Sequence, residues 1–481
     1  MSSEKGNNET RLAVFAAVWA LAQIQHYVIL YPNFVVRDQW QWWPVFALAI
    51  ALACKPRSTY LLVALLVAQL VCIWPRMPFV PNHIVLEVFI AIGLLASFAS
   101  TRIQRTPKAQ EIPLCSGGIP TARGIVLLMY VIAALHKLNW DYWDSGYSSA
   151  AQLMKLTAGH MNWMEFPAPA YPIAIAGSVL IELSIPFLLL RPSTRVVGIG
   201  LSLAFHTALG IAPASGIKGF SATMTAALVL FLPKAYCDQI SEALASTRLK
   251  LFGGKLGAIQ AAYGATLIWL VVLSVGIRVQ QGNEQAYVAG GQQWFFFVAA
   301  VDLGFLLLVI SRMRQRKGHQ EKAGSPAPIS RSRTLLTPLI LGLFILNGLC
   351  PYLGLKTETS FSMFSNLRTE ESRTNHWFIP SRLQIFDFQR DTVEIIEADH
   401  PKLARRRKDR LRMTYFEFRR VCSQAREINV TYRRNGGAVQ RLSRENNVVC
   451  EQPAASPLNY LLAKLFRFKP VQTTEHYHWS H

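Results

Sequence analysis

Apolar residues run along the chain in long blocks that are separated by short polar stretches. The blocks are roughly 15–22 residues long, about the length that a helix needs to cross a bilayer. They predict about eleven membrane spans: Leu12–Tyr31, Trp42–Cys54, Tyr60–Trp74, His83–Ser100, Gly124–Leu138, Ile173–Leu190, Val196–Ala212, Phe220–Leu232, Leu256–Val275, Phe295–Ile310 and Leu335–Pro351. Trp42–Cys54 and Phe220–Leu232 are short, so re-entrant or strongly buried segments are the alternative for these two. Residues 1–355 are therefore expected to form an all-α polytopic membrane helix bundle.

The hydrophobic pattern changes after the last block, and residues 356–481 predict a small soluble domain. Arg382–Glu397 alternates as strands do, whereas Thr414–Glu417 matches a capping box at the start of a helix. Ile428–Leu442 reads as a hairpin that turns at Asn435-Gly436. Leu458–Phe468 is apolar and basic, as in segments that lie on a membrane surface. This domain is expected to be α+β.

The charged residues orient the bundle. The chain carries 49 Lys+Arg against 28 Asp+Glu, a net charge of +21, while 51% of its residues are hydrophobic and 16% are charged. The amino-terminal tail and the loops on its side of the membrane hold 21 Lys+Arg, and the opposite loops hold only six. Because cytoplasmic loops are enriched in Lys and Arg, the amino terminus is expected in the cytoplasm and the C-terminal domain outside it. The basic balance thus reflects membrane orientation and a basic tail domain, and no nucleic-acid partner is predicted.

Cysteine and histidine spacing indicates no metal site. The seven cysteines include no CxxC pair, and the spans contain no dense HxxxH or HxxHH clusters. The histidines of the segment His476–His481 are discounted because terminal tails are usually disordered. Cys422 and Cys450 share the C-terminal domain, and the sequence leaves open whether they pair.

Polar side chains inside membrane spans must be paired or functional, because burying them in hydrocarbon costs free energy. Lys137 ends the fifth span in the stretch VIAALHKLNWDYW. One interpretation is a lysine whose ammonium reaches the headgroups along the helix surface. The other is an amine held in a partly dry chamber, where its neutral form is favoured and it acts as a base. Asp141 or Asp144 could instead pair with it and keep it charged.

Other polar residues offer partners for these groups. Glu182 lies in the sixth span and needs a proton or a partner, which His206, Lys137 or an arginine could provide. His206, in the seventh span, also fits a buried histidine that only hydrogen-bonds a neighbour. His83 and Glu87 lie one helical turn apart in the fourth span. That pair fits a proton relay, a metal-ligand pair or a satisfied interfacial pair.

The region from Val126 to Leu232 resembles the HTTM family, the horizontally transferred transmembrane domain shared with vitamin K-dependent gamma-carboxylase. The resemblance rests on His-Lys-Leu-Asn at 136–139, the Trp140–Tyr147 aromatic cluster, Glu182 in its span and Phe205-His206. The segment SMFSNLRTEESRTNHWFIP at 362–380 also looks like the region after the last span in bacterial members.

The resemblance implies a chemistry. In the carboxylase the matching lysine is the base that deprotonates vitamin K hydroquinone; oxygenation then yields a strong base, a glutamate loses a gamma-proton, and carbon dioxide adds. By that resemblance Lys137 would be the base, with His206 supporting the quinol or an oxyanion. The candidate catalytic residues are Lys137, His206, His136 and Glu182, and the candidate cosubstrate-binding residues are Trp140, Tyr142 and Trp143. The carboxylase has a much larger lumenal region, so a peptide substrate here would need another binding surface.

Two other functions compete with a lyase-type membrane enzyme that uses reduced vitamin K or another quinol. Glu182, the His83/Glu87 pair and Asp302 could form the path of a non-enzymatic transporter, although no inverted repeat is apparent. The C-terminal domain carries basic residues from Arg405 to Arg412. An accessory protein could use them to bind anionic lipid headgroups or an acidic peptide or protein.

Overall fold

The computed structural model describes residues 2–29, 42–103, 114, 117–212, 215–241, 336–444 and 457–474. The chain forms two compact units. Unit 1 contains Met1–Ile73, His83–Tyr130 and Leu183–Gly342, and unit 2 contains Trp74–Asn82, Val131–Glu182 and Leu343–His481. Four helices therefore carry residues of both units: α5 (Asn82–Ile103), α6 (Gly118–His136), α9 (Ala170–Leu190) and α15 (Leu336–Leu349).

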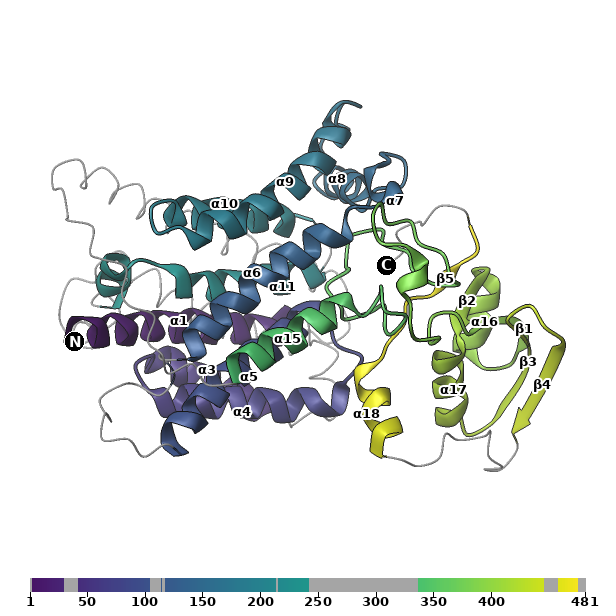
Figure 1. Ribbon diagram of the computed structural model, residues 1–481, viewed down its shortest axis with the longest axis horizontal. Coiled ribbons are helices and arrows are strands. Elements are labelled where there is room, and N and C mark those ends of the chain that lie inside the picture. Colours follow the sequence, from purple (N-terminus) through teal and green to yellow (C-terminus); the bar gives the residue numbers. More distant parts are fainter. Residues whose placement is uncertain are drawn as a thin grey trace. The chain divides into compact units, whose positions relative to one another are not determined.

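Helices dominate the part of the chain that the structure describes (Figure 1). They are α1 (Ser2–Ile29), α3 (Trp43–Cys54), α4 (Thr59–Ile73), α5 (Asn82–Ile103), α6 (Gly118–His136), α7 (Trp140–Trp143), α8 (Ser149–His160), α9 (Ala170–Leu190), α10 (Arg195–Gly210), α11 (Ser215–Leu228), α15 (Leu336–Leu349), α16 (Pro401–Lys408), α17 (Tyr415–Gln424) and α18 (Pro457–Leu465). Short 3-10 turns lie at η2 (Trp74–Arg76), η3 (Val229–Phe231) and η4 (Ser381–Leu383).

Four helical segments among the described residues are long and apolar enough to cross a membrane: Thr59–Arg76, Asn82–Arg102, Gly118–His136 and Ala170–Leu190. A fifth candidate is the pair Ile217–Phe231 and Lys234–Ser241, which bends by 113° and is either a broken span or a re-entrant loop. An integral membrane protein is thus confirmed at this coarser level, and the total of eleven spans stays a prediction. Leu256–Val275 and Phe295–Ile310 lie outside the described residues. The helix at Trp43–Cys54 has only 12 residues, in line with its short hydrophobic block.

Unit 1 is built around α1, which packs against α3 and α11. Its interior is apolar but contains polar side chains that bond to one another or to the backbone. Trp19 donates from Nε1 to Gln69 Oε1 at 3.1 Å, and Arg11 donates from Nε to the carbonyl of Leu232 at 3.1 Å. Such bonds offset the cost of placing polar groups away from water.

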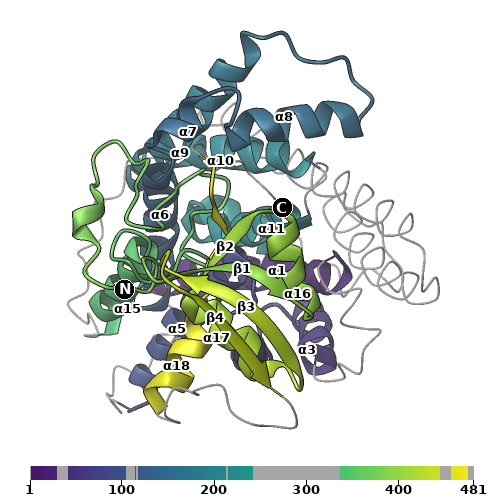
Figure 2. The same ribbon diagram turned by 90° about the vertical axis from the view of Figure 1, so that its right-hand side faces the viewer.

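Unit 2 ends in a five-stranded antiparallel sheet, which is visible in Figure 2. The strands are β1 (Thr392–Ala398), β2 (Leu411–Thr414), β3 (Ile428–Arg434), β4 (Val439–Arg444) and β5 (Val471–Gln472), in the spatial order β4-β3-β1-β2-β5. The prediction of α+β structure after the last span is therefore confirmed.

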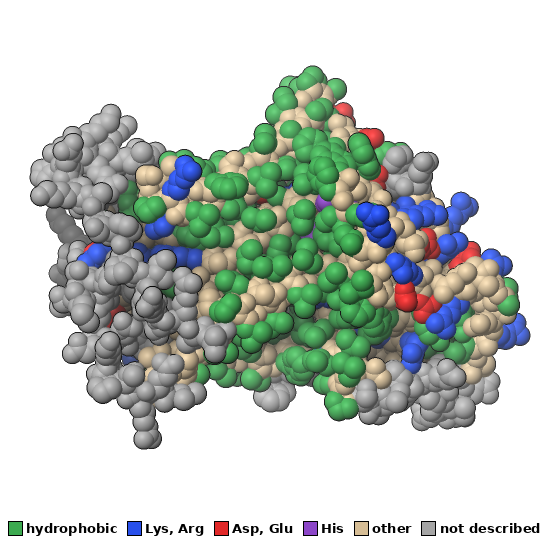
Figure 3. Space-filling model, in the orientation of Figure 1, with side chains coloured by type: hydrophobic (Ala, Val, Ile, Leu, Met, Phe, Trp, Pro, Cys, Tyr) green, Lys and Arg blue, Asp and Glu red, His purple; other side chains and the backbone are tan. Residues whose placement is uncertain are grey.

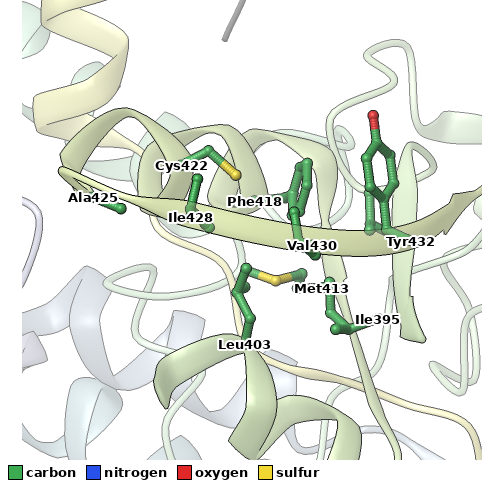
Figure 4. Packing of buried hydrophobic residues seen from close by; sticks show 10 residues of the cluster. Ile395, Leu403, Met413, Phe418, Cys422, Ala425, Ile428, Val430 and Tyr432 are labelled. Carbon is green, nitrogen blue, oxygen red and sulfur yellow. The ribbon is translucent and has the colours of Figure 1, made fainter. Parts of the chain in front are cut away.

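The core of this sheet region explains why its sequence alternates. Alternate residues of β3, namely Ile428, Val430 and Tyr432, are buried, and so are Val393 and Ile395 of β1. Leu403 of α16 and Phe418 and Cys422 of α17 complete the cluster, as Figure 4 shows. Cys422 is thus a core residue, and Cys450 lies outside the described residues, so their pairing stays open.

Two local predictions in this region are confirmed. Asn435 and Gly436 have φ angles of 49° and 71°, and they join β3 to β4 in the expected hairpin. Thr414 caps α17 by accepting a hydrogen bond from the backbone amide of Glu417. The Glu417 carboxylate bonds Arg420 at 2.8 Å and the amide of Phe468 at 3.1 Å. Of the two bonds of a capping box, the structure therefore shows the one made by the Thr414 side chain.

Hydrophobic side chains cover the helical part of the chain on the face shown in Figure 3, and Lys and Arg side chains gather over the C-terminal sheet region. Several large apolar side chains on the candidate spans are well exposed: Val71 is 66% exposed, Ile173 71%, Leu180 62% and Phe187 68%. Exposed apolar side chains on candidate spans are typical of helices that face lipid. On α18, Leu458 is 62% and Tyr460 57% exposed, which agrees with the predicted membrane-surface segment.

Gly354 is a position where only glycine fits, and its replacement has a testable effect. Its φ is 79°, and a Cβ added there would lie 2.0 Å from the carbonyl oxygen of Phe386. We expect Gly354→Ala to lower the unfolding free energy by at least about 1–3 kcal/mol, because the backbone must shift or stay strained. Chemical denaturation in detergent micelles, followed by circular dichroism, measures the change. Gly177→Ala is the matched control, since nothing lies within 4 Å of its Cβ position in helix α9. An equal loss in both variants would contradict the steric explanation.

Candidate functional site at a buried lysine–glutamate pair

Lys137 follows the last residue of α6 and is almost completely enclosed. Its exposed fraction is 7%, and its backbone amide continues the helix by donating to the carbonyl of Ala134 at 3.1 Å. The Nζ atom donates to Oε1 of Glu182 on α9 at 2.5 Å. The ammonium therefore does not extend to the surface, and of the partners considered from the sequence the structure shows Glu182. A void beside the amine stays a prediction.

The two aspartates near Lys137 in sequence have other contacts. Asp141 accepts a hydrogen bond from Nδ2 of Asn375 at 2.7 Å, and Asp144 accepts one from the amide of Gly146 at 2.7 Å. Asp144 thus closes its own turn. These bonds explain why Glu182, distant in sequence, becomes the partner of the ammonium.

One carboxylate oxygen of Glu182 accepts a hydrogen bond from Lys137, and the other has no donor among the described residues. Its residue is 6% exposed, and among the described residues its Oε2 atom has no hydrogen-bond partner. A buried carboxylate oxygen without a donor costs free energy, so this atom is an acceptor ready for a donor from a ligand or from water. The pair therefore combines a fixed cation with an open proton acceptor.

Tyr142 forms the third side of this site. Its ring centroid lies 5.7 Å from Nζ of Lys137, a cation–π distance, and its hydroxyl hydrogen-bonds Ser178 at 2.5 Å. Tyr142 is only 1% exposed and stands on the short helix α7, which Asn139 caps by accepting from the amide of Tyr142 at 2.9 Å. Among the three aromatic candidates, Tyr142 is the one whose ring faces the ammonium.

Trp140 and Trp143 lie at the surface. Trp140 is 69% exposed and Trp143 is 37% exposed, and both rings contact Trp377, with centroids 5.7 and 5.2 Å away. Trp143 donates from Nε1 to the backbone carbonyl of Lys137 at 3.0 Å. Exposed tryptophans next to the end of a span are typical of the membrane interface. Trp143 thus supports the backbone of the site.

His136 is held by bonds at both ring nitrogens. Nε2 lies 3.0 Å from the carbonyl oxygen of Ser360, which only accepts, so this nitrogen carries the hydrogen. Nδ1 then accepts from the hydroxyl of Tyr352 at 2.9 Å. With both nitrogens engaged, His136 links α6 to the segment after α15 and has a structural role in this arrangement.

His206 belongs to unit 1. Its Nε2 atom lies 2.7 Å from the hydroxyl of Tyr130, which also contacts Ser202. Rings of Phe205 and Phe220 surround it, with centroids 5.6 and 5.5 Å away. These contacts match the interpretation of a buried histidine that bonds a neighbour.

A strained, polar and buried segment adjoins the site, and the sequence did not single it out for chemistry. Thr359, Phe361, Phe364 and Asn366 have positive φ angles of 58°, 64°, 53° and 53°. Such angles are rare for bulky or β-branched residues and cost about 1–3 kcal/mol each. Strain of this kind gathers at functional sites, where surrounding bonds hold it in place.

Side chains from elsewhere in unit 2 hold that segment. Asn82 accepts from the amide of Phe361 at 2.8 Å, and Asn347 donates to the carbonyl of Thr359 at 3.0 Å. Asn139 donates to the carbonyl of Ser365 at 2.6 Å. The sequence signal for this segment was the resemblance of residues 362–380 to the region after the last span in bacterial HTTM members.

Lys356 begins this segment and gives a pH-dependent prediction. It is 5% exposed and donates to Thr359 Oγ1 at 3.0 Å, and its burial lowers its pKa from 10.5 to about 8. Between these values the unfolded chain binds more protons than the folded one, so stability rises with pH. We expect wild type to gain up to about 3 kcal/mol relative to Lys356→Met from pH 8 to 10.5. Parallel denaturation curves of the two proteins at all pH values would contradict this.

Among the described residues, no group of three or more His, Cys, Asp or Glu side chains is placed to hold a metal ion. No protein-family model matches the chain, and no curated protein or solved structure matches it significantly.

Proposed function

We propose that this chain is an integral membrane enzyme whose Lys137–Glu182 pair transfers a proton from a hydrophobic hydroxyl cosubstrate such as a quinol. The observation that supports this most is the buried ion pair with one open carboxylate oxygen. The proposal agrees with the resemblance to the gamma-carboxylase family at residues 136–147. The proton transfer proposed here involves both Lys137 and Glu182, and not the Lys137 amine alone.

The geometry gives Lys137 and Glu182 different roles. A lysine that donates to a carboxylate at 2.5 Å holds its proton between the two groups, so its lone pair is not free. The open Oε2 of Glu182 can accept the proton of a bound hydroxyl. The Lys137 ammonium then stabilises the oxyanion that remains, in a site of low dielectric constant where such stabilisation is strong. Tyr142 stabilises the same cation through its ring.

The partners follow from the same proposal. A quinol such as reduced vitamin K partitions into lipid and can reach a residue at the end of a span from the bilayer. A peptide substrate would come from the extracytoplasmic side, where the basic helix α16 attracts acidic groups. In the carboxylase-like reaction, dioxygen and carbon dioxide are the further reactants that the resemblance implies.

Anaerobic mixing of reduced vitamin K with the purified protein in micelles tests the first step. We expect the ultraviolet absorption of the quinolate anion with wild-type protein and its loss with Glu182→Gln. Lys137→Arg keeps the positive charge and should retain part of the signal. Lys155→Ala is the matched control, because Lys155 lies in the same unit and is 5.2 Å from the Tyr171 ring but is exposed. A quinolate signal in Glu182→Gln as strong as in wild type, or none in wild type, contradicts the proposal.

A further inference from the structure

Unit 1 contains a second group of titratable side chains, far in sequence from Lys137. His83 and Glu87 lie one turn apart on α5, and His26 of α1 packs beside both. His26 Nδ1 is 3.2 Å from Glu87 Oε1, and the His26 and His83 ring centroids are 5.0 Å apart. All three residues are at most 1% exposed. We call His26, His83 and Glu87 the inner polar cluster.

The contacts of His26 place its ring at an ion-pair distance from Glu87. Its Nε2 lies 3.0 Å from the carbonyl oxygen of Gly219, so Nε2 carries a hydrogen and donates it. Nδ1 then lies 3.2 Å from Glu87 Oε1, an ion-pair distance without a direct hydrogen bond, and a proton held by the pair removes the repulsion between a nitrogen lone pair and a buried anion. That proton belongs either to an imidazolium or to a carboxylic acid. In both cases the pair binds one proton more than a neutral histidine and a carboxylate would.

Other polar atoms around the cluster have no partner among the described residues. They include the two ring nitrogens of His83, whereas the Gln23 side chain hydrogen-bonds the Glu87 carboxylate. Glu87 Oε1 also accepts from Thr223 at 2.7 Å. A structural pair that was fully satisfied would not leave a histidine with two bare nitrogens at 0% exposure.

A small cavity adjoins the cluster. It is lined by Gln23, His26, Trp42, Val45, Gln69, Ile73, Ile84 and Glu87, and its volume of about 10 Å³ is close to that needed by one water molecule. Polar atoms of His26, Glu87 and the two glutamines give such a water the two to four partners that buried waters have.

Among the described residues that line the cavity, Glu87 is the one carboxylate. α1 carries Gln23 and Gln25 beside His26, α4 carries Gln69, and α11 carries Thr223. On α11, Lys218 directly precedes Gly219 and is the ammonium nearest to the cluster along that helix. Proton binding here is therefore governed by His26, His83 and Glu87.

We propose that the inner polar cluster is a proton-transfer site: His26 and Glu87 together hold one bound proton, and a water in the adjoining cavity, which both residues line, exchanges it. The transfer is a movement of the proton between oxygen and nitrogen atoms and needs no other reactant. The ligands of the site are a proton and a water molecule. The site is independent of the proton transfer proposed at Lys137.

Solid-state NMR of the full-length protein in liposomes, with ¹⁵N-labelled histidine, tests the shared proton. We expect a far-downfield ring proton that disappears in both His26→Gln and Glu87→Gln. Glu87→Gln keeps the size of the side chain, and Glu394→Gln, in the ion pair with Arg433 on the C-terminal sheet, is the matched control that should retain the signal. A spectrum without this proton in wild type, or one unchanged by Glu87→Gln, overturns the proposal.

A separate pair of variants tests the water in the cavity. Val45→Leu adds a methylene to the cavity wall without touching the three titratable residues, and Val67→Leu makes the same change at a residue that is 46% exposed. We expect a water-to-His26 cross-peak in wild type and Val67→Leu, and its loss in Val45→Leu, while the shared proton remains. Absence of the cross-peak in wild type, or its persistence in Val45→Leu, overturns the role of the water.

Discussion

Lys137→Ala is expected to lower the unfolding free energy by about 3–5 kcal/mol, because it leaves the Glu182 carboxylate buried without a counterion. Glu182 is 6% exposed and bonds Lys137 at 2.5 Å. Its second oxygen already lacks a partner among the described residues. Chemical denaturation of the purified protein in micelles, followed by circular dichroism, measures the loss.

The double variant Lys137→Met/Glu182→Leu separates stability from function. Replacing a buried ion pair by apolar residues of similar size is often neutral or stabilising, so this variant should recover most of the free energy lost in Lys137→Ala. It should not recover quinol deprotonation, because both charges are gone.

A surface pair provides the control. Arg412→Ala removes the partner of Glu371 at 2.9 Å, and the arginine side chain is 38% exposed, so we expect a cost of about 1 kcal/mol or less. If Lys137→Ala costs no more than Arg412→Ala, the buried pair is not an important electrostatic element of the fold.

The sequence predicted local features well because they depend on neighbouring residues. The turn at Asn435-Gly436 needs two positive φ angles, which these residue types adopt readily. The cap at Thr414 needs a hydroxyl three residues before a free amide. Hydrophobic blocks likewise predicted the positions of the helices, since lipid and core both require apolar side chains. None of these features needs knowledge of which helices are neighbours.

The partners inside the bundle depend on packing between helices, which no periodicity in one sequence can supply. Lys137 had several possible partners, and α9 brings Glu182 to it. His206 was a candidate for the same site, yet its ring nitrogen bonds Tyr130 within unit 1. Trp140 and Trp143 were candidate cosubstrate-binding residues, but aromatic composition does not reveal that both are exposed. Finally, non-glycine residues with positive φ, such as Phe361, carry no sequence signature.

Asn139→Leu is expected to cost about 3 kcal/mol or more, because it removes bonds from several buried groups at once and each costs about 1–3 kcal/mol when left unmade. Asn139 is 0% exposed. Its Nδ2 donates to the carbonyls of His136 at 2.8 Å and Ser365 at 2.6 Å. Its Oδ1 accepts from the amide of Tyr142 at 2.9 Å and from Asn375 at 3.2 Å. The strained segment should become susceptible to proteolysis, which mass spectrometry of the fragments can locate.

Asn139→Asp distinguishes hydrogen bonding from packing, because it has nearly the same shape but replaces the two donors by an acceptor. A carboxylate facing the carbonyls of His136 and Ser365 is repelled by both, so we expect Asn139→Asp to cost as much as Asn139→Leu. Asn429→Leu is at an exposed asparagine of β3 whose side chain bonds Asp399 and Ser443 in water, so it should cost about 1 kcal/mol or less. If Asn139→Asp proves as stable as wild type, the two donated bonds do not hold the segment, and its positive φ angles must be maintained by Asn82, Asn347 and Ser149 instead.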